Sequence, residues 1–496
     1  MNRRSEMSTA INPVPSLEAQ AVVSVVSEIP DSTQSVGVLV GSDGAVASSL
    51  GFDRDRLNAL GFTGAVGETL VIPPSNGPIT VVVGIGDGLT DLRSVGAAFA
   101  RASGKLTDLA LDLTALPGSV DDPSVAEAVV EGVLLSRYHY PVLKNEAPGA
   151  PVERLTLVGS GAASAGAERG RVLARATALA RDLANTPHSH LSATRFSEIA
   201  IELGPRFGVD VEVFEPEALV EMKMAGLLAI NAGSAEEARL IKLSYRPEGA
   251  AGSLALVGKG LMYDSGGLSL KPSDAVHAQM KNDMSGAAAV FAAMLSLGDL
   301  GCTTSVTGYL ACTDNMPSGT ATALGDVITY RDGTTVEMLD TDAEGRVVMA
   351  DTLILAREQG VDAVVDIATL TGSAMRALGS DIAALFANND AIAAQVEAAS
   401  ENSGESVWRL PLHKPYRQAI DSLTADMMNC APIGKPDAII ASLFLSHFVG
   451  DVPWAHIDMC GPAQADSATG LQVPGCSGWG ARVLAHIALG FTPPAS

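Results

Sequence analysis

Aromatic residues are scarce in this sequence, at 4% of 496 residues, whereas alanine, glycine, valine and leucine are abundant. That composition disfavours an aromatic-rich β-sandwich and favours tightly packed layers of helices and strands. Hydrophobic residues make up 47% of the chain, so a large core can be buried. Because one hydrophobic core rarely extends over so long a chain, we expect two domains.

Cysteine is also scarce, and its five positions form no C-x-x-C pair. The spacing excludes a disulfide scaffold and predicts reduced thiols. Cys430 and Cys460 could act as a nucleophile or form a bridge, but we interpret them as buried structural thiols. No apolar run reaches about 18 residues, which argues against a membrane-spanning helix. The first 20 residues have two arginines with no apolar stretch behind them, so we expect no secretory signal and a cytoplasmic protein.

Positive charge is limited to 32 basic residues against 56 acidic ones, which gives a net charge of -24. A surface this negative repels nucleic acid and anionic lipid headgroups. It suits a protein that handles small or cationic ligands. Since acidic residues are common, a single aspartate carries little information, and only an ordered acidic cluster is evidence for a site.

Short apolar runs alternate with helical stretches along the first 160 residues. The predicted strands are 21–28, 36–41, 79–84 and 154–159, and the predicted helices are 89–104 and 124–138. One longer helix is predicted over 163–185, and it ends at Thr186-Pro187 because proline cannot continue a helix. We therefore predict an N-terminal α/β domain over 1–162, a connector helix over 163–187 and a catalytic domain over 188–496.

The same alternation is sharper beyond residue 192. The predicted strands are 238–245, 253–258, 303–310, 361–368 and 453–459, and the predicted helices are 284–298, 346–358, 388–402 and 438–449. This order predicts a larger C-terminal domain with a central, mainly parallel or mixed sheet covered by helices on both faces. Ligands in such sheets bind at the carboxyl ends of the strands.

Three weaker motifs are set aside. The glycines of 83–88 follow a strand but lack the full G-x-G-x-x-G spacing of a dinucleotide loop, so we interpret them as a turn. His188 and His190 form an H-x-H in a Pro/Ser-rich segment without a local third ligand, and we favour a solvated loop over a metal site. A G-x-S-x-G nucleophile elbow is absent from the sequence, which disfavours an ordinary serine hydrolase.

Three segments, 257–271, 280–286 and 340–346, combine glycines with charged residues near predicted strand ends. They carry four carboxylates, two lysines and an arginine: Asp264, Asp283, Asp342, Glu344, Lys259, Lys271 and Arg346. Ordinary turn chemistry explains each residue singly, for example Asp283 as a helix N-cap. It does not explain their gathering, so we predict one site.

The predicted position of each residue supports that site. Lys259 follows the apolar strand 253–258 and is expected at the carboxyl edge of the sheet. Asp342 and Glu344 are expected in a turn between a strand at 335–339 and the helix from 346, where their side chains can converge.

Charge favours two divalent metals in this site. Four carboxylates balance two dications, their hard oxygens suit Zn²⁺, Mn²⁺ or Mg²⁺, and closely spaced metals need a bridging carboxylate. An ammonium has no lone pair, so Lys259 binds metal only as a neutral amine, which a nearby dication favours. Lys271 and Arg346 then place positive charge where an anionic tetrahedral intermediate forms. His277 is the one histidine within 254–372, which disfavours a histidine general base. The attacking water must therefore be activated mainly by metal, with an oxygen base held nearby.

The segment Asp340-Thr-Asp-Ala-Glu-Gly-Arg346 resembles the N-T-D-A-E-G-R signature of the leucine aminopeptidase family, also called the cytosol aminopeptidases. The resemblance covers the catalytic half and extends to 181–187, 366–372, 408–412 and 452–458. The N-terminal 160 residues resemble the family only in pattern. Two departures are Asp340, where the family usually has asparagine, and one extra residue between Lys271 and Asp283.

The resemblance implies a two-metal aminopeptidase, holding Mn²⁺ or Zn²⁺, that releases N-terminal leucine or other apolar residues from peptides. By the same resemblance, Asp264 and Glu344 bridge both metals, and Lys259 and Asp283 complete the tighter site. Asp342 binds the readily exchanged metal. Family members are homohexamers.

The remaining roles also follow from the resemblance. Lys271 polarises the scissile carbonyl, and Arg346 holds a bicarbonate ion that acts as general base. The residues expected to contact the substrate are Met280, Asp340, Thr369, Leu370 and Gly372.

Two other function classes stay open at this point. Some family members also bind DNA, so a regulatory DNA-binding role is one alternative, although the net charge of -24 argues against it. A two-metal hydrolase of another bond, such as a phosphoester, is the second, because Lys271 and Arg346 could serve a phosphate. A salt-dependent gel shift tests the first, and a comparison of amide with phosphoester substrates tests the second.

Overall fold

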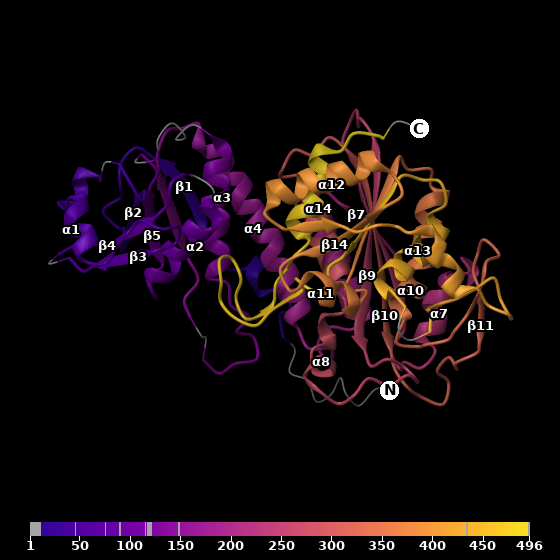
Figure 1. The fold of residues 1–496 in the computed structure, drawn as a ribbon. Coiled ribbons are helices and arrows are strands. Elements are labelled where there is room, and N and C mark those ends of the chain that lie inside the picture. The colour runs from indigo at the N-terminus through magenta and orange to yellow at the C-terminus, as the bar shows by residue number, and fades with distance from the viewer. Residues whose placement is uncertain are drawn as a thin grey trace. The chain divides into compact units, whose positions relative to one another are not determined.

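The computed structural model describes residues 11–494 except 45, 75, 89–90, 115, 117–121, 147–148 and 433–434. These residues form two compact units (Figure 1). The N-terminal unit comprises residues 14–178 and 465–475, and the larger unit comprises 11–13, 179–464 and 476–494. The long helix α4 (Ala163–Asn185) contributes residues to both. The described helices include none long and apolar enough to cross a membrane.

The N-terminal unit is built on a six-stranded sheet with the order β1-β6-β5-β2-β4-β3. All neighbours are parallel except β3 and β4. The strands are β1 (Val22–Val26), β2 (Ser35–Val40), β3 (Thr69–Ile72), β4 (Ile79–Gly84), β5 (Asp108–Asp112) and β6 (Arg154–Val158). Its helices are α1 (Arg54–Ala59), α2 (Leu92–Ala102) and α3 (Pro123–Ser136). The predicted helix 89–104 corresponds to α2, and its residues 89–90 lie outside the described residues.

The larger unit contains an eight-stranded mixed sheet with the order β15-β14-β17-β13-β9-β10-β8-β7. Its strands are β7 (Asp210–Phe214), β8 (Arg239–Tyr245), β9 (Ser253–Asp264), β10 (Ser305–Asn315), β13 (Ala363–Ala368), β14 (Ala383–Ala387), β15 (Val407–Arg409) and β17 (Trp454–Asp458). The central strands β10, β9, β13 and β17 are parallel to one another, whereas β7, β8 and β14 introduce antiparallel pairs. The α/β class and the sheet-centred larger domain predicted from the sequence are confirmed.

Helices cover both faces of this sheet (Figure 1). One layer contains α9 (Ser285–Met294), α12 (Asp390–Ser403) and α14 (Ala481–Gly490). The other contains α7 (Ala225–Asn231), α10 (Glu344–Glu358) and α13 (Asp437–Val449). Further elements of this unit are α5 (Ala193–Leu203), α6 (Pro216–Glu221), α8 (Ala275–Ala278), α11 (Gly372–Leu378), β11 (Val327–Thr329), β12 (Thr335–Glu337) and β16 (Met427–Met428).

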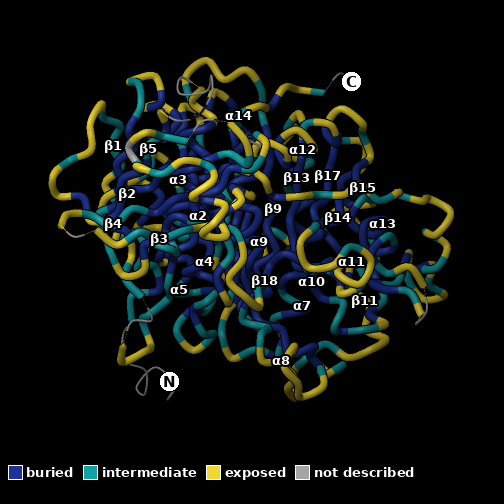
Figure 2. The backbone as a smooth tube through the Cα atoms, turned by 60° about the vertical axis from the view of Figure 1, so that its left-hand side comes forward, coloured by how far each residue is buried: buried dark blue, intermediate teal, exposed yellow. Residues whose placement is uncertain are grey.

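Helix α9 packs directly on the backbone of the central strands, because small residues face it there. A Cβ at Gly286 would lie 2.3 Å from the carbonyl oxygen of Ile367, and one at Gly258 would lie 2.6 Å from the Cα of Ala287. All ten residues of α9 are buried (Figure 2). The close approach fixes the start of α9, and therefore the neighbouring Asp283, against the sheet.

The expected end of the strand at residue 258 is wrong. Strand β9 continues to Asp264, because its backbone stays paired with β10 well beyond the apolar run. The glycines and Lys259, which end the hydrophobic pattern, lie inside the strand. Backbone hydrogen bonds to β10 extend the strand there, and the side-chain pattern of β9 alone does not indicate them. Lys259 lies inside β9 but is the first residue beyond its pairing with β13, which stops at Gly258, so it still lies at the carboxyl end of that neighbouring strand.

Candidate metal centre

Strand β9 contributes two residues of the predicted site, Lys259 and Asp264. They are five positions apart, so regular alternation would place them on opposite faces of the sheet. The pairing with β10 shifts by one residue between Thr313 and Asp314, which leaves one extra residue in β9. Such a bulge re-aims the side chains that follow it. We attribute the convergence of Lys259 and Asp264 on one site to this bulge.

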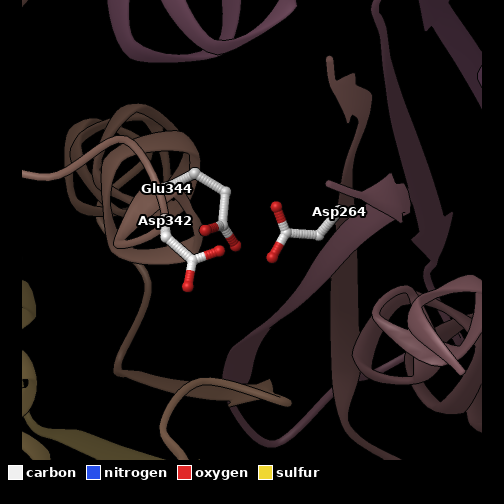
Figure 3. A group of neighbouring side chains, drawn as sticks. All are labelled: Asp264, Asp342 and Glu344. Atoms are coloured by element: carbon white, nitrogen blue, oxygen red, sulfur yellow. The ribbon is translucent and has the colours of Figure 1, made fainter. Parts of the chain in front are cut away.

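The remaining carboxylates come from two other segments. Asp283 lies between a short 3-10 turn (Met280–Asn282) and α9, and Asp342 and Glu344 lie at the start of α10. Ligand oxygens of Asp264, Asp342 and Glu344 lie within 4.8 Å of one another (Figure 3). The predicted turn position is wrong for Glu344, which is the first residue of α10. That position still orients its carboxylate towards the cluster.

Lys259 is buried among the carboxylates. Its Nζ lies 2.8 Å from Asp283 Oδ2 and 2.8 Å from Glu344 Oε1, and it donates to the carbonyl oxygen of Thr369. Space for the side chain depends on Gly345, where a Cβ would lie 2.6 Å from Lys259 Cε. Asp283 is therefore not a helix N-cap, because its carboxylate accepts from Lys259 and from the Thr369 hydroxyl.

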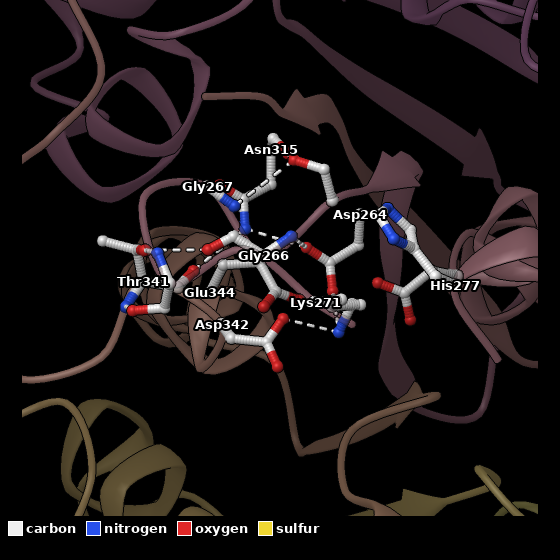
Figure 4. A network of polar contacts seen from close by, with 12 residues as sticks. Asp264, Gly266, Gly267, Lys271, His277, Asn315, Thr341, Asp342 and Glu344 are labelled. Carbon is white, nitrogen blue, oxygen red and sulfur yellow. Dashed lines mark hydrogen bonds and ion pairs between the residues drawn. The ribbon is translucent and has the colours of Figure 1, made fainter. Parts of the chain in front are cut away.

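Lys271 holds the other side of the cluster (Figure 4). Its Nζ lies 2.7 Å from Asp264 Oδ2 and 2.5 Å from Asp342 Oδ1. The lysine comes from the loop after β9, whose Gly266 N–H donates to Asp264 Oδ1. A cation at this position lies between two carboxylates of separate chain segments.

Burial and mutual repulsion penalise the carboxylates in their charged form. Burial, followed by the charge of Asp264, raises the pKa of Asp342 to about 6. Burial likewise raises the pKa of Glu344 and of Asp283. For Lys259 burial acts to lower the pKa, but the surrounding carboxylates, Asp283 first, raise it overall. The two lysines offset only part of the negative charge of the carboxylates, so keeping all of them ionised is costly.

These residues fit a site for divalent cations. Glu344 Oε2 is buried and has no hydrogen-bond partner among the described residues. A buried, unsatisfied carboxylate oxygen is costly unless a ligand or ion completes it. Clustered hard oxygens are the donors that Mn²⁺, Mg²⁺ and Zn²⁺ accept. Mutual repulsion contributes to the raised pKa values of these carboxylates, and the positive charge of bound cations would relieve it.

Two asparagines that the sequence reasoning missed hold the ligand segments in place. Asn429 is fully buried, and its side chain bonds the backbone at Leu339, Asp340 and Ala343. Asn315 donates to Asp264 Oδ1 at 2.8 Å and to a neighbouring carbonyl. Asn429 is distant in sequence, so no local signal marks it. Asn315 ends β10 beside β9, and a longer predicted strand would have indicated it.

The loop after β13 is fixed by Asp458 at the end of β17. Asp458 accepts from the backbone N–H groups of Leu370, Thr371 and Cys460 and from the Thr371 hydroxyl at 2.6 Å. Thr369, in the same loop, contacts Asp283 and Lys259. The predicted contact residue Thr369 therefore lies beside the cluster, Leu370 follows it in the same loop, and Gly372 begins α11 after Thr371.

Arg346, Asp340 and Met280 take more separate positions. Arg346 is buried on α10, where it pairs with Asp437 at 2.9 Å and donates to the carbonyl of Asn429. Its Nε has no hydrogen-bond partner within the described residues. Asp340 Oδ1 accepts from the N–H of Asp342, a turn contact that asparagine would make equally well. Met280 begins the 3-10 turn before Asp283.

The weaker motifs take no part in this cluster. His188 is half-buried in a turn, with Nε2 3.6 Å from Asp314 Oδ2, which corrects the expected solvated loop for this residue. The cysteines are free thiols, and those other than Cys460 are buried.

Comparisons with known proteins identify the chain's relatives. Residues 178–485 match the model of the cytosol aminopeptidase family catalytic domain, and residues 54–147 match that of its N-terminal domain. A probable cytosol aminopeptidase of Streptomyces avermitilis is 40% identical over 498 residues, covering 95% of this chain and 96% of the relative. One of Chlorobaculum tepidum is 41% identical over 440 residues, covering 83% and 86%.

Solved structures agree with these relatives. The bottromycin maturation enzyme BotP in complex with Mn is similar with a TM-score of 0.84 and 38% identity, over 92% of this chain and 99% of the other. A mutant tomato leucine aminopeptidase gives a TM-score of 0.85 and 29% identity, over 95% and 96%. The fold, the buried oxygen cluster and these comparisons agree. The chain belongs to the cytosol aminopeptidase family, and it is a metal-dependent aminopeptidase.

Proposed function

We propose that this enzyme removes N-terminal leucine and other apolar residues from peptides at a centre of two divalent cations, Mn²⁺ or Zn²⁺. The observation that supports this most directly is the buried cluster of Asp264, Asp342 and Glu344 oxygens within 4.8 Å of one another. With Asp283, the cluster offers four negative charges, which balance two dications.

Each ligand has a distinct role in the proposal. Asp264 and Glu344 would serve both cations, Lys259 and Asp283 would complete the tighter-held site, and Asp342 would hold the readily exchanged cation. When bound, such cations supply Lewis acidity and lower the pKa of a bound water. Lys259 serves there as a neutral amine, because nearby dications reverse the carboxylate field that favours its charged form.

Two cationic residues serve the chemical step. Burial acts to lower the pKa of Lys271, but Asp264, Glu344 and Asp342 raise it overall, so the side chain stays charged. It polarises the scissile carbonyl and stabilises the negative charge that develops on that oxygen. Arg346, whose buried Nε has no hydrogen-bond partner in the described chain, holds a bicarbonate ion that acts as general base.

The substrate is oriented by the loop after β13. Thr369, Leu370 and Gly372 contact the peptide backbone, while Met280 lines the side-chain pocket and Asp340 lies on the substrate side. The metal centre, when occupied, would hold the free α-amine of the peptide, which would restrict cleavage to the first residue. We further propose that the enzyme is a cytoplasmic homohexamer. Sedimentation velocity of the purified protein tests the hexameric assembly.

The activity is tested with a fluorogenic leucine amide and protein loaded with Mn²⁺ or Zn²⁺. We expect metal-dependent release of leucine, and no cleavage when the leucine amine is acetylated. Glu344→Ala and Lys271→Ala should each remove turnover. Absence of metal-dependent turnover, or full activity in either variant, contradicts the proposal.

A further inference from the structure

The N-terminal unit contains a cavity of about 180 Å³, and no residue of the metal centre is among those that line it. The C-terminal end of α3, residues 15–21 and one face of α4 surround it. Arg171, Ala174, Arg175 and Ala178 of α4 line it at the spacing of a single helical face. The two alanines leave room between the two arginines, so the cavity is a consequence of the α4 sequence.

The charge of the lining is opposite to that of the whole chain. The described lining residues include Arg137, Arg171, Arg175 and His139, and none of them is acidic. This contrasts with a net charge of -24 over the sequence. Arg171 is partly neutralised, since its guanidinium bonds Glu168 at 2.5 and 2.8 Å.

Arg137 is the most informative of these residues because its side chain is buried, with an exposed fraction of 6%. Its guanidinium donates to the carbonyl oxygens of Ala100, Leu106 and Ala150. Within the described residues, no carboxylate pairs with it. Carbonyl oxygens satisfy its donors but leave its full positive charge uncompensated, and a buried charge without a counter-charge is costly.

The positive charge of the lining also affects the pKa of His139. Burial, followed by the charges of Arg137 and Lys144, lowers the pKa of His139. A Cβ at Gly149 would lie 2.2 Å from His139 Nε2, so the imidazole is held closely in place. An anion in the cavity would offset this potential.

The rest of the lining is mainly apolar and includes Leu134, Tyr138, Pro151 and Val152. A dry cavity of roughly 150 Å³ holds a benzene molecule, so this one accommodates a body of about that size. Apolar walls with a few polar groups are typical of small-molecule sites. We infer that this cavity binds a small carboxylate with an apolar, ring-sized body, whose charge is recognised by Arg137 and Arg175.

The test uses three probes of matched shape and different charge: phenylacetate, phenylacetamide and phenethylamine. Isothermal titration of the metal-loaded full-length protein should show binding of phenylacetate at least tenfold tighter than that of the other two. Equal affinity for the three, or no binding of phenylacetate at millimolar concentration, overturns the inference.

Variants locate the site. Arg175→Met removes charge from the cavity, and Ala178→Leu fills it; each should weaken phenylacetate binding roughly tenfold. Arg154→Met, on β6 outside the lining, should change it less than about twofold. Glu344→Ala damages the metal centre but not the cavity, so binding should persist. Binding that is lost in Glu344→Ala and kept in Arg175→Met would assign the ligand to the metal centre and refute the inference, whatever the outcome for peptide hydrolysis.

Discussion

Both units are built on sheets with parallel central strands, yet among the described residues the buried carboxylate cluster lies at the strand ends of the larger unit. In the N-terminal unit, Asp112 ends β5 and bonds the N–H and hydroxyl of Thr114 at 2.9 and 2.6 Å. Asp87, after β4, accepts from the hydroxyl of Ser42. Each of these carboxylates is satisfied by a neighbouring turn, and Asp87 is exposed.

In the larger unit, by contrast, Asp264 at the end of β9 and Glu344 at the start of α10 have buried carboxylates that face one another. Asp264 and Glu344 each have an exposed fraction of 2%, and Lys259 and Lys271 lie between them and their neighbours. The difference arises because β9 extends beyond its apolar run and bulges, and because the start of α10 is brought against it. A parallel sheet supplies the edge, but the burial of several carboxylates against one another creates the site.

The largest effect is expected from Glu344→Gln. The substitution keeps the shape of the side chain and removes the charge of the carboxylate whose Oε2 has no hydrogen-bond partner among the described residues. Metal content and kcat/KM should therefore both fall by at least about a hundredfold. Metal analysis of dialysed protein and the leucine amide assay measure these changes. Asp112→Asn, at the strand end of the other sheet, should leave both within about twofold, and a comparable loss there would break the comparison.

Asn429→Ala should have the next largest effect, because Asn429 holds the backbone on both sides of Asp342. Supporting residues of this kind typically contribute roughly tenfold to hundredfold in metal affinity. A competition titration with a metal-binding dye measures the loss. Asn388→Ala is the matched control, since Asn388 also bonds a loop backbone but has no contact with the cluster. Equal metal affinity in both variants would exclude a positioning role for Asn429.

Gly345→Ala should reduce activity roughly tenfold, because its Cβ would lie 2.6 Å from Lys259 Cε and 2.8 Å from Nζ. The displaced lysine alters the site that it shares with Asp283. Leucine amide kinetics measure the change. At Gly319 a Cβ meets open space, so Gly319→Ala should retain wild-type rates; a normal rate in Gly345→Ala would show that Lys259 tolerates displacement.

In metal-free protein, the pH dependence of stability should distinguish the buried carboxylates of the larger unit from those at the strand ends of the N-terminal unit. The pKa of Asp342 is about 6 in the folded state against 3.8 for the ordinary residue. The folded protein therefore binds more protons in this interval, and stability falls as the pH rises from about 4 to about 6. Asp342→Asn lacks this effect, so its Tm advantage over wild type should grow across that interval. A constant difference in Tm would contradict the raised pKa.

The smallest effect is expected from Asp340→Asn. The asparagine oxygen would keep the bond from the N–H of Asp342, so kcat/KM should change less than about threefold. The charge of Asp340 contributes to the raised pKa of Asp342, so the stability transition should move to slightly lower pH. A large change in kcat/KM would instead place Asp340 in direct contact with substrate.

The sequence by itself determined the α/β class, the family and the positions of most central elements. Apolar periodicity indicated the strands that became β8, β13 and β17 within about two residues, since a buried strand must present an apolar run. The charged segments indicated which residues form a site, because glycine-flanked carboxylates and lysines are poorly explained one by one.

Only the tertiary structure decided how those residues meet. The extension of β9 to Asp264 and its bulge depend on pairing with β10, which a one-dimensional pattern does not contain. The same holds for Asn429 and Asp458, which act on loops about 90 residues away in sequence. Local sequence sets which conformations each segment prefers, whereas long-range hydrogen bonds and burial determine which side chains share one volume and how strongly their charges interact.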